Sequence, residues 1–268
     1  MSPSRYLFFL SRIMKGRGNT STPFLLAVLG TAFGTAAMIL VLGIMNGFQL
    51  RFIDSIIGVK AYQATISTAG EDLSALKHQL SDVPVVTKAV PFVDGQTLFT
   101  TDYGYEQGLL VRGIDADSAM SDTRFFYSLK MVRGRFDVHD NRIIIGYELA
   151  LKTGIEVGDK IELLNLSGSS AMNISQTPYV VTGLFHSGYY EYNNGLAFIN
   201  YNNAVEMFGS SGSGIGIRFS RGVSLGKGMS IIHQQTGMEP VSWKYENPAF
   251  FNALRMEKLA MGVLVGLI

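Results

Sequence analysis

The longest run of hydrophobic residues in the chain covers residues 23–45, PFLLAVLGTAFGTAAMILVLGIM, and contains no charged side chain. At about 1.5 Å of rise per residue, a helix of this length reaches roughly 35 Å, against a bilayer hydrocarbon core of about 30 Å. A buried helix of a soluble protein usually has a run about half as long. The pattern therefore predicts a transmembrane helix, which we place at residues 23–47.

The charges that flank this run indicate its orientation. Four basic residues and no acidic residue precede it: Arg5, Arg12, Lys15 and Arg17. The charges that follow it are mixed, so the positive-inside rule places the N-terminus in the cytoplasm. Residues 5–17 also carry apolar side chains at helical spacing, which predicts an interfacial helix within a cytoplasmic segment 1–22.

One face of the predicted span carries small side chains. Gly30 and Gly34 have the small-xxx-small spacing that lets a second helix approach closely. This spacing also arises by chance in membrane helices, so helix packing is one of two interpretations.

The pattern after the span mixes the periods of strands and helices. The first half predicts strands near 61–68, 85–90, 96–101 and 108–114, with a helix at 72–80. Short strands then follow at 142–145, 160–166, 178–185 and 196–199, with helices at 147–153 and 202–208. After a glycine- and serine-rich linker come a strand, a helix and a strand, at 215–219, 225–235 and 240–243. The fold class is α+β. If residues 115–208 are an insertion, the last three elements belong to the same α+β unit as the elements before residue 115.

The last ten residues, 259–268, are wholly apolar and follow Arg255, Glu257 and Lys258. They predict the start of a second membrane helix. Ten residues rise only about 15 Å, half of what a span needs, so we expect the chain to be part of a longer one.

Composition excludes several functions. The chain has 268 residues, a net charge of +1 and no cysteine. A near-neutral balance offers no basic face for phosphates, so no nucleic-acid partner is expected. The absence of cysteine removes disulfides and thiolate metal sites.

Candidate catalytic and metal residues are sparse. The four histidines are far apart in the sequence and lack companions at ligand spacing: His78, His139, His186 and His233. Asp115 and Asp117 follow a predicted strand and are interpreted as a turn and helix cap. The glycine-rich run at 209–219 leads into a strand, whereas phosphate-binding loops open a helix. We therefore expect no metal, no cofactor and no catalytic site.

Several segments resemble a known family, in order along nearly the whole chain. Two of them are shared widely: Met45-Asn46-Gly47-Phe48 at the end of the span, and IIIGYELA at 143–150, followed by Gly154 and Val157-Gly158-Asp159. Two are more specific: GLFHSGYYEY at 183–192 and Arg255-Met256-Glu257-Lys258. Together they resemble the LolC/LolE family of lipoprotein-releasing ABC transporter permeases, within the wider macrolide-exporter and FtsX-like superfamily.

The resemblance implies a permease subunit of an ATP-driven complex in the cell inner membrane, with its large domain, 48–258, in the periplasm. It implies that the complex extracts lipoproteins from the membrane and passes them to a carrier. The domain would comprise a porter-like unit, 48–114 with 215–250, and a sabre-like insertion, 115–208. The chain would not be an enzyme, because a separate LolD-like ATPase subunit hydrolyses ATP. Other implied partners are a second permease subunit, a LolA-like periplasmic carrier, the lipoprotein cargo and membrane lipid.

Two candidate sites follow from this resemblance. Met38, Leu42, Met45 and Phe48 form a flexible apolar stripe that suits contact with lipoprotein acyl chains, although ordinary lipid-facing or helix-packing residues would look the same. The loop at 166–177 is long for a hairpin and lies where the family has its carrier-docking hairpin. Its candidate docking residues are Ser169, Ser170, Ala171, Met172, Asn173 and Ile174. The alternative is a flexible connection that folds back onto the sheet.

Two other functions stay open. One is a tripartite-exporter or FtsX-like permease, in which the outer domain couples ATP hydrolysis to a periplasmic partner. The other is a membrane-anchored extracytoplasmic binding or sensor domain without an ATPase.

Overall fold

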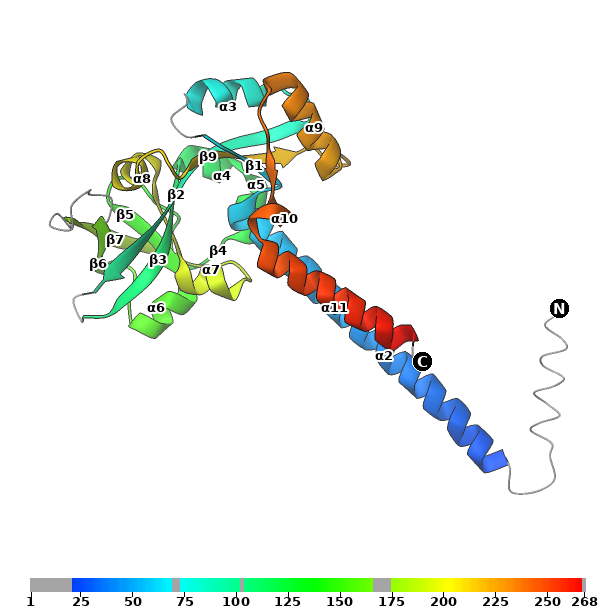
Figure 1. Ribbon diagram of the computed structural model, residues 1–268. Coiled ribbons are helices and arrows are strands. Elements are labelled where there is room, and N and C mark those ends of the chain that lie inside the picture. Colours follow the sequence, from blue (N-terminus) through cyan, green and yellow to red (C-terminus); the bar gives the residue numbers. More distant parts are fainter. Residues whose placement is uncertain (1–20, 69–72, 102–103, 166–174, 267–268) are drawn as a thin grey trace. The chain divides into compact units, whose positions relative to one another are not determined.

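The computed structural model describes residues 21–68, 73–101, 104–165 and 175–266 (Figure 1). It divides into two units, residues 1–50 with 260–268, and residues 51–259. The predicted interfacial helix at 5–17 lies outside the described residues.

The first unit consists of parts of two helices. Helix α2 (Ser21–Ile56) begins in this unit and continues into the second, and α11 (Pro248–Gly266) ends in it. Among the described residues, only the helical segment Thr22–Ala61 is long and apolar enough to cross a membrane, with a mean hydropathy of 2.3 over an 18-residue window, which agrees with the predicted span. Helix α11 begins well before residue 259, and its role as a second membrane span stays a prediction.

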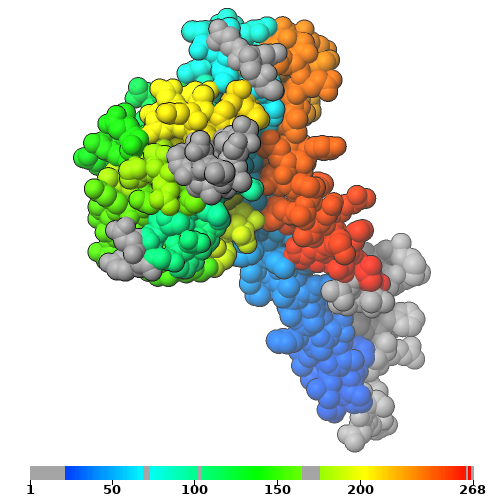
Figure 2. Space-filling model, turned by 60° about the vertical axis from the view of Figure 1, so that its left-hand side comes forward, coloured from blue at the N-terminus to red at the C-terminus, as the bar shows by residue number. Residues whose placement is uncertain are grey.

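The second unit contains a four-stranded antiparallel sheet covered by two helices. Its elements are β1 (Ala64–Ser67), α3 (Leu73–Ser81), the first half of β2 (Val86–Thr100), β9 (Ser213–Phe219), α9 (Leu225–Thr236) and β10 (Val241–Ser242). The strand order β10-β1-β9-β2 and the β-α-β-β-α-β succession are those of a ferredoxin-like unit. Helices α3 and α9 lie side by side in both views (Figures 1 and 2). They contribute Leu76, Leu80 and Ile232 to a core shared with the sheet.

The remaining strands close into a ring. The ring follows the pairings of β2, β3 (Glu106–Ile114), β8 (Leu196–Asn200), β5 (Arg142–Gly146), β7 (Ser175–His186) and β6 (Lys160–Asn165), which returns to β2 through Phe99 and Leu163. Strand residues alternate between its two faces, as the strand period requires. Ile143 and Ile145 belong to the interior core, whereas Ile144 belongs to a second core outside it. Strand β4 (Lys130–Gly134) pairs with β7.

Strand β2 differs from its prediction. The sequence indicated two strands, at 85–90 and 96–101, but the structure has one continuous strand. Pro91 is tolerated because pairing with β3 begins only at Phe92, so Pro91 has a ladder partner on one side. Strand β3 pairs with β2 and β8, so it belongs to the ring, whereas the sequence assigned 108–114 to the porter-like unit. The division at residue 115 therefore does not follow the strand pairing.

Short helices complete the second unit. Two of them, α6 (Tyr147–Thr153) and α8 (Tyr201–Phe208), agree with the prediction. The pattern did not predict α4 (Ala116–Ser121), α5 (Thr123–Ser128), α7 (Tyr190–Gly195) or α10 (Trp243–Glu246). Asp115 caps α4 by accepting a hydrogen bond from the Ser118 backbone N–H at 3.1 Å, so its predicted capping role is confirmed.

The end of α2 is held against the outside of the ring. A π-helical segment, η1 (Ile57–Ala61), follows α2 directly. Its buried residues Ile57, Val59 and Ala61 share the second core with Phe125 of α5 and with Ile144 and Phe198 of the ring. This packing positions the candidate site described below.

Candidate functional site

The predicted acyl-chain stripe lies along α2. Met38, Leu42, Met45 and Phe48 are spaced by four, three and three residues, which returns to one side of a helix with about 3.6 residues per turn. Met38 and Leu42 are half-buried, and Met45 and Phe48 are 36% and 56% exposed. The stripe is thus one face of a single helix, and its contact with acyl chains stays a prediction.

The small-residue face of α2 is open. A Cβ atom added to Gly30 or Gly34 would meet nothing within 4 Å. A shallow groove on this helix is lined by Ala27, Thr31 and Thr35, among others. The two threonine hydroxyls donate to carbonyls one turn earlier, at 2.9 and 2.8 Å, so they are satisfied within the helix. Close approach of a second helix is sterically possible here and stays a prediction.

The predicted carrier-docking residues, 169–174, lie outside the described residues. The strands on either side are described, and they pair antiparallel from Lys160 with Val180 to Asn165 with Ser175. The loop at 166–174 therefore connects two strands of one hairpin, as the sequence predicted.

A site that the sequence did not predict lies where α2 ends. The last carbonyl groups of a helix have no partner within it and need other donors. Arg218 of β9 donates through Nη1 to the Ile57 carbonyl at 2.9 Å and through Nη2 to the Gly58 carbonyl at 2.8 Å. Arg112 of β3 donates to the Lys60 carbonyl. We call Arg112 and Arg218 the arginine pair.

Each member of the arginine pair is buried and is held by an aspartate. The Arg218 Nε donates to Asp122 at 2.5 Å, and Asp122 also caps α5. Arg112 makes a bidentate contact to Asp94, at 2.7 and 2.8 Å. Positive charge at a helix C-terminus is also favoured by the helix dipole. The geometry fixes the end of the helix through its main chain.

Tyr62 lies beside both guanidinium groups. They lie over its ring at 5.9 Å for Arg112 and 4.5 Å for Arg218. Tyr62 has a φ of 53°, which is uncommon for a residue with a side chain, and burial raises the pKa of its hydroxyl to about 12. A side chain at Gly216 would come within 2.1 Å of this ring, so glycine is required there.

A polar cavity of about 340 Å³ adjoins Arg112. Its lining includes Lys60, which follows α2, and Glu246 and Asn247, which precede α11. The Lys60 ammonium lies 2.9 Å from Asp94, and the Thr65 hydroxyl donates to Glu246. A residue just after α2 and two residues just before α11 therefore line the same cavity.

The pKa values around the cavity reflect burial and pairing. Burial alone would raise the pKa of Asp94, but the charges and hydrogen bonds of Arg112 and Lys60 outweigh it and lower this pKa to about 2. Burial lowers the pKa of Lys60 and raises that of Glu246. Asp94 therefore stays ionised at any physiological pH.

The aromatic motif at 183–192 is partly buried in the second unit, whereas Tyr190 is 51% exposed. Tyr189 contacts Tyr192 edge-to-face with ring centroids 4.9 Å apart, and it also contacts Phe52 of α2 and Phe250 of α11. Asn193 accepts from the Ser187 backbone N–H at 2.8 Å, which fixes the turn before α7. The motif thus links the last turns of α2 to the start of α11.

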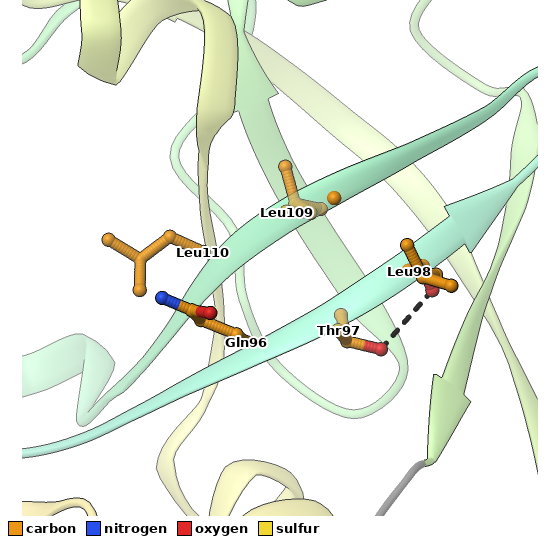
Figure 3. Close-up of a pocket in the computed structure, with 6 residues that line it drawn as sticks. Gln96, Thr97, Leu98, Leu109 and Leu110 are labelled. Carbon is orange, nitrogen blue, oxygen red and sulfur yellow. Dashed lines mark hydrogen bonds between the residues drawn. The ribbon is translucent and has the colours of Figure 1, made fainter.

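A second hollow, of about 400 Å³, lies on the β2–β3 hairpin (Figure 3). Its outer-face residues are Gln96, Leu98, Gly108 and Leu110, which face one another across the ladder. The described residues contain no group of three or more histidine or acidic side chains that could hold a metal ion.

Residues 24–234 match the family model of the MacB-like periplasmic core domain. "Lipoprotein-releasing system transmembrane protein LolC" of Xylella fastidiosa is 28% identical over 98% of this chain and 65% of its own length. The protein of the same name from Neisseria meningitidis is 26% identical over the same shares.

The chain thus spans about 65% of the length of these curated relatives. Among solved structures, the periplasmic region of MacB from Actinobacillus actinomycetemcomitans covers 74% of this chain and 96% of its own, with 12% identity and a TM-score of 0.45. The family match covers most of the chain, including nearly all of α2 and the second unit as far as residue 234. The chain therefore belongs to the LolC-like permease family whose extracytoplasmic part is a MacB-like periplasmic core domain.

Proposed function

We propose that this protein is a permease subunit of an ABC transporter that extracts lipoproteins from the inner membrane and passes them to a periplasmic carrier. The observation that carries this proposal is the match of 98% of the chain to relatives named as lipoprotein-releasing transmembrane proteins. An uncharged span joined to a large α+β domain supports it. The partners are a LolD-like ATPase subunit, a second permease subunit, a LolA-like carrier, the lipoprotein cargo and membrane lipid.

The proposed function assigns separate roles to residues in the membrane and to residues in the periplasm. In the membrane, the stripe of Met38, Leu42, Met45 and Phe48 contacts acyl chains, since methionine adapts to apolar groups of varied shape. Gly30 and Gly34 allow the second permease subunit to approach α2 closely. ATP is hydrolysed on the ATPase subunit, so this chain contributes the surfaces that contact the cargo and the conformational change that moves it.

A transfer experiment tests the proposal. The native complex is reconstituted in liposomes with a fluorescent triacylated lipoprotein, and release into the soluble fraction is measured with ATP and purified carrier. We expect release that requires both ATP and carrier. The same lipoprotein without acyl chains, enclosed in the vesicles, is the control. Active ATP hydrolysis without any lipoprotein release would contradict the proposal.

Carrier docking by residues 169–174 has its own test. Replacing residues 169–175 by a short Gly-Asn turn should abolish carrier binding, because the loop supplies Met172 and Ile174 as apolar contacts. Of the β6–β7 ladder, the replacement changes only the terminal residue Ser175, so folding and assembly with the ATPase should stay intact. Unchanged carrier binding in this variant would exclude the loop as the docking site.

The second candidate is an exporter or FtsX-like permease that couples ATP hydrolysis to a periplasmic partner. The match of residues 24–234 to the MacB-like core domain favours it. The control arm of the transfer experiment separates the two functions. Export of the acyl-free protein without release of the lipoprotein would favour this second function.

A further inference from the structure

We infer that Arg112 and Arg218 are positioning residues that pass a displacement of α2 to the extracytoplasmic domain during transport. This inference rests on the proposed function, because it assigns the arginine pair a part in the ATP-driven cycle. It starts from the direction of the hydrogen bonds. Both arginines donate to main-chain carbonyls of η1, at Ile57, Gly58 and Lys60.

Contacts to main-chain carbonyls restrict the helix end more than apolar packing does. The second core holds η1 through Ile57, Val59 and Ala61, but hydrophobic contact is non-directional and permits sliding or rotation. A hydrogen bond weakens steeply when its angle is distorted. Guanidinium donors at successive carbonyls therefore fix both the rotation and the axial position of the segment that ends α2.

The arginine pair also connects η1 to both parts of the second unit. Arg218 lies on β9 of the ferredoxin-like sheet, whereas Arg112 lies on β3 of the ring. Asp122 and Asp94 fix the two guanidinium planes, and the ring of Tyr62 lies beside both. A displacement of the helix end would therefore be applied to both parts together.

Stability alone does not account for this arrangement. Replacing a buried ion pair by apolar groups of similar volume is often neutral or stabilising, because burial of charge costs desolvation energy. Two buried pairs that converge on one helix end are better explained by the geometry they impose. The Lys60–Asp94 pair and the Thr65–Glu246 contact add the segments after α2 and before α11 to the same network.

The test compares coupling with folding in the native complex. The principal variant combines Arg218→Met with Asp122→Asn, which removes the donors without leaving a lone charge and keeps an acceptor for the α5 cap. We expect ATP hydrolysis to continue while lipoprotein released per ATP falls by about tenfold, which lies within the range for loss of a coupling contact. Arg218→Lys keeps the charge but not the planar guanidinium group, so the lipoprotein released per ATP should fall by a smaller factor in this variant.

A control uses another arginine–aspartate pair of the same unit, in which the arginine side chain is 41% exposed and the aspartate also contacts Arg135 and His139. Arg142 donates to Asp137 at 2.6 Å and makes no contact with η1 that the structure shows. Arg142→Met with Asp137→Asn should leave release per ATP unchanged. An equal loss in this control would mean that the effect is general destabilisation and would overturn the inference, as would wild-type release in the principal variant.

A second measurement does not depend on the cargo. The chain has no cysteine, so spin labels can be placed specifically at the exposed residues Leu50 and Leu151. The distance distribution between them should broaden in the principal variant and stay as in wild type in the Arg142 control. If the distance distribution broadens in the principal variant but the wild-type complex never releases lipoprotein, the coupling role is supported and the proposed function is refuted. An unchanged distribution would overturn the coupling role itself.

Discussion

Replacing Gly58 by alanine tests how η1 is packed at the end of α2. An added Cβ would lie 1.9 Å from the Ser128 Oγ and 2.5 Å from the Ser128 Cβ. The next neighbour, the Arg124 carbonyl, is 3.7 Å away, which is an ordinary contact. The clash therefore involves one side chain, that of Ser128 at the end of α5.

The magnitude follows from two opposing effects. Overpacking a filled site costs about 1–3 kcal/mol. Alanine recovers about 0.5–1 kcal/mol relative to glycine within a helix. Gly58→Ala should therefore lower the free energy of unfolding by about 1 kcal/mol, within a range of about 0–2.5 kcal/mol. If Ser128 is first changed to glycine, the space is free, and Gly58→Ala should then be neutral or stabilising.

The assay is a double-mutant cycle on the detergent-solubilised protein, with chemical unfolding followed by tryptophan emission. Trp243 is the single tryptophan of the chain, is 6% exposed and lies in the core that holds η1. The coupling energy between positions 58 and 128 should be about 1–3 kcal/mol, as for residues in contact. Additive effects of the two changes would refute the described packing of η1 against α5.

Three further predictions use the same chain. Because the folded-state pKa of Asp94 is lowered from 3.8 to about 2, its contribution of about 2 kcal/mol is present above pH 4 and is lost as the pH falls towards 2; Asp94→Asn should remove this acid limb of the unfolding curve. Photo-crosslinkers at Met45 and Phe48 should capture lipoprotein; if they fail while crosslinkers at other positions of α2 succeed, the stripe is ordinary helix surface. Gly226→Ala in α9 should raise the free energy of unfolding by about 0.5–1 kcal/mol, because its Cβ meets nothing within 4 Å; destabilisation there would contradict the open space.

The sequence predicted the local elements better than their assembly. Periodicity identified the span and most strands because each depends on neighbouring residues. The closed ring depends on the pairing of Phe99 with Leu163, which are far apart in the chain, so no local pattern indicates it. The pattern predicts two strands within residues 85–101, and Pro91, a residue type usually excluded from a strand interior, lies between them. Its one-sided pairing is visible only in the assembled sheet.

The candidate site also has a part that local sequence predicts and a part that depends on the assembled fold. The stripe on α2 could be predicted because it depends on spacing along one helix. The arginine pair was missed because its acceptors, the carbonyls of η1, leave no signature in side-chain identity. One signal was available: Arg218 stands in a strand that is otherwise apolar and glycine-rich, and a buried charge needs a partner. That the partners are Asp122 and two main-chain carbonyls could not be predicted.

One helix connects the proposed lipid contact to the proposed coupling site. Phe48 ends the apolar stripe, and η1 begins at Ile57, so about 14 Å of helix rise separates them. A permease without catalytic groups can use ATP only through changes in conformation, and a ligand shifts such an equilibrium only by its differential contact with two states. Under the proposed function, an acyl chain that contacts Met45 and Phe48 in one position of α2 and not in another would supply that difference. The arginine pair would then make the extracytoplasmic domain respond to the same position of the helix, which links cargo contact to the surface that meets the carrier.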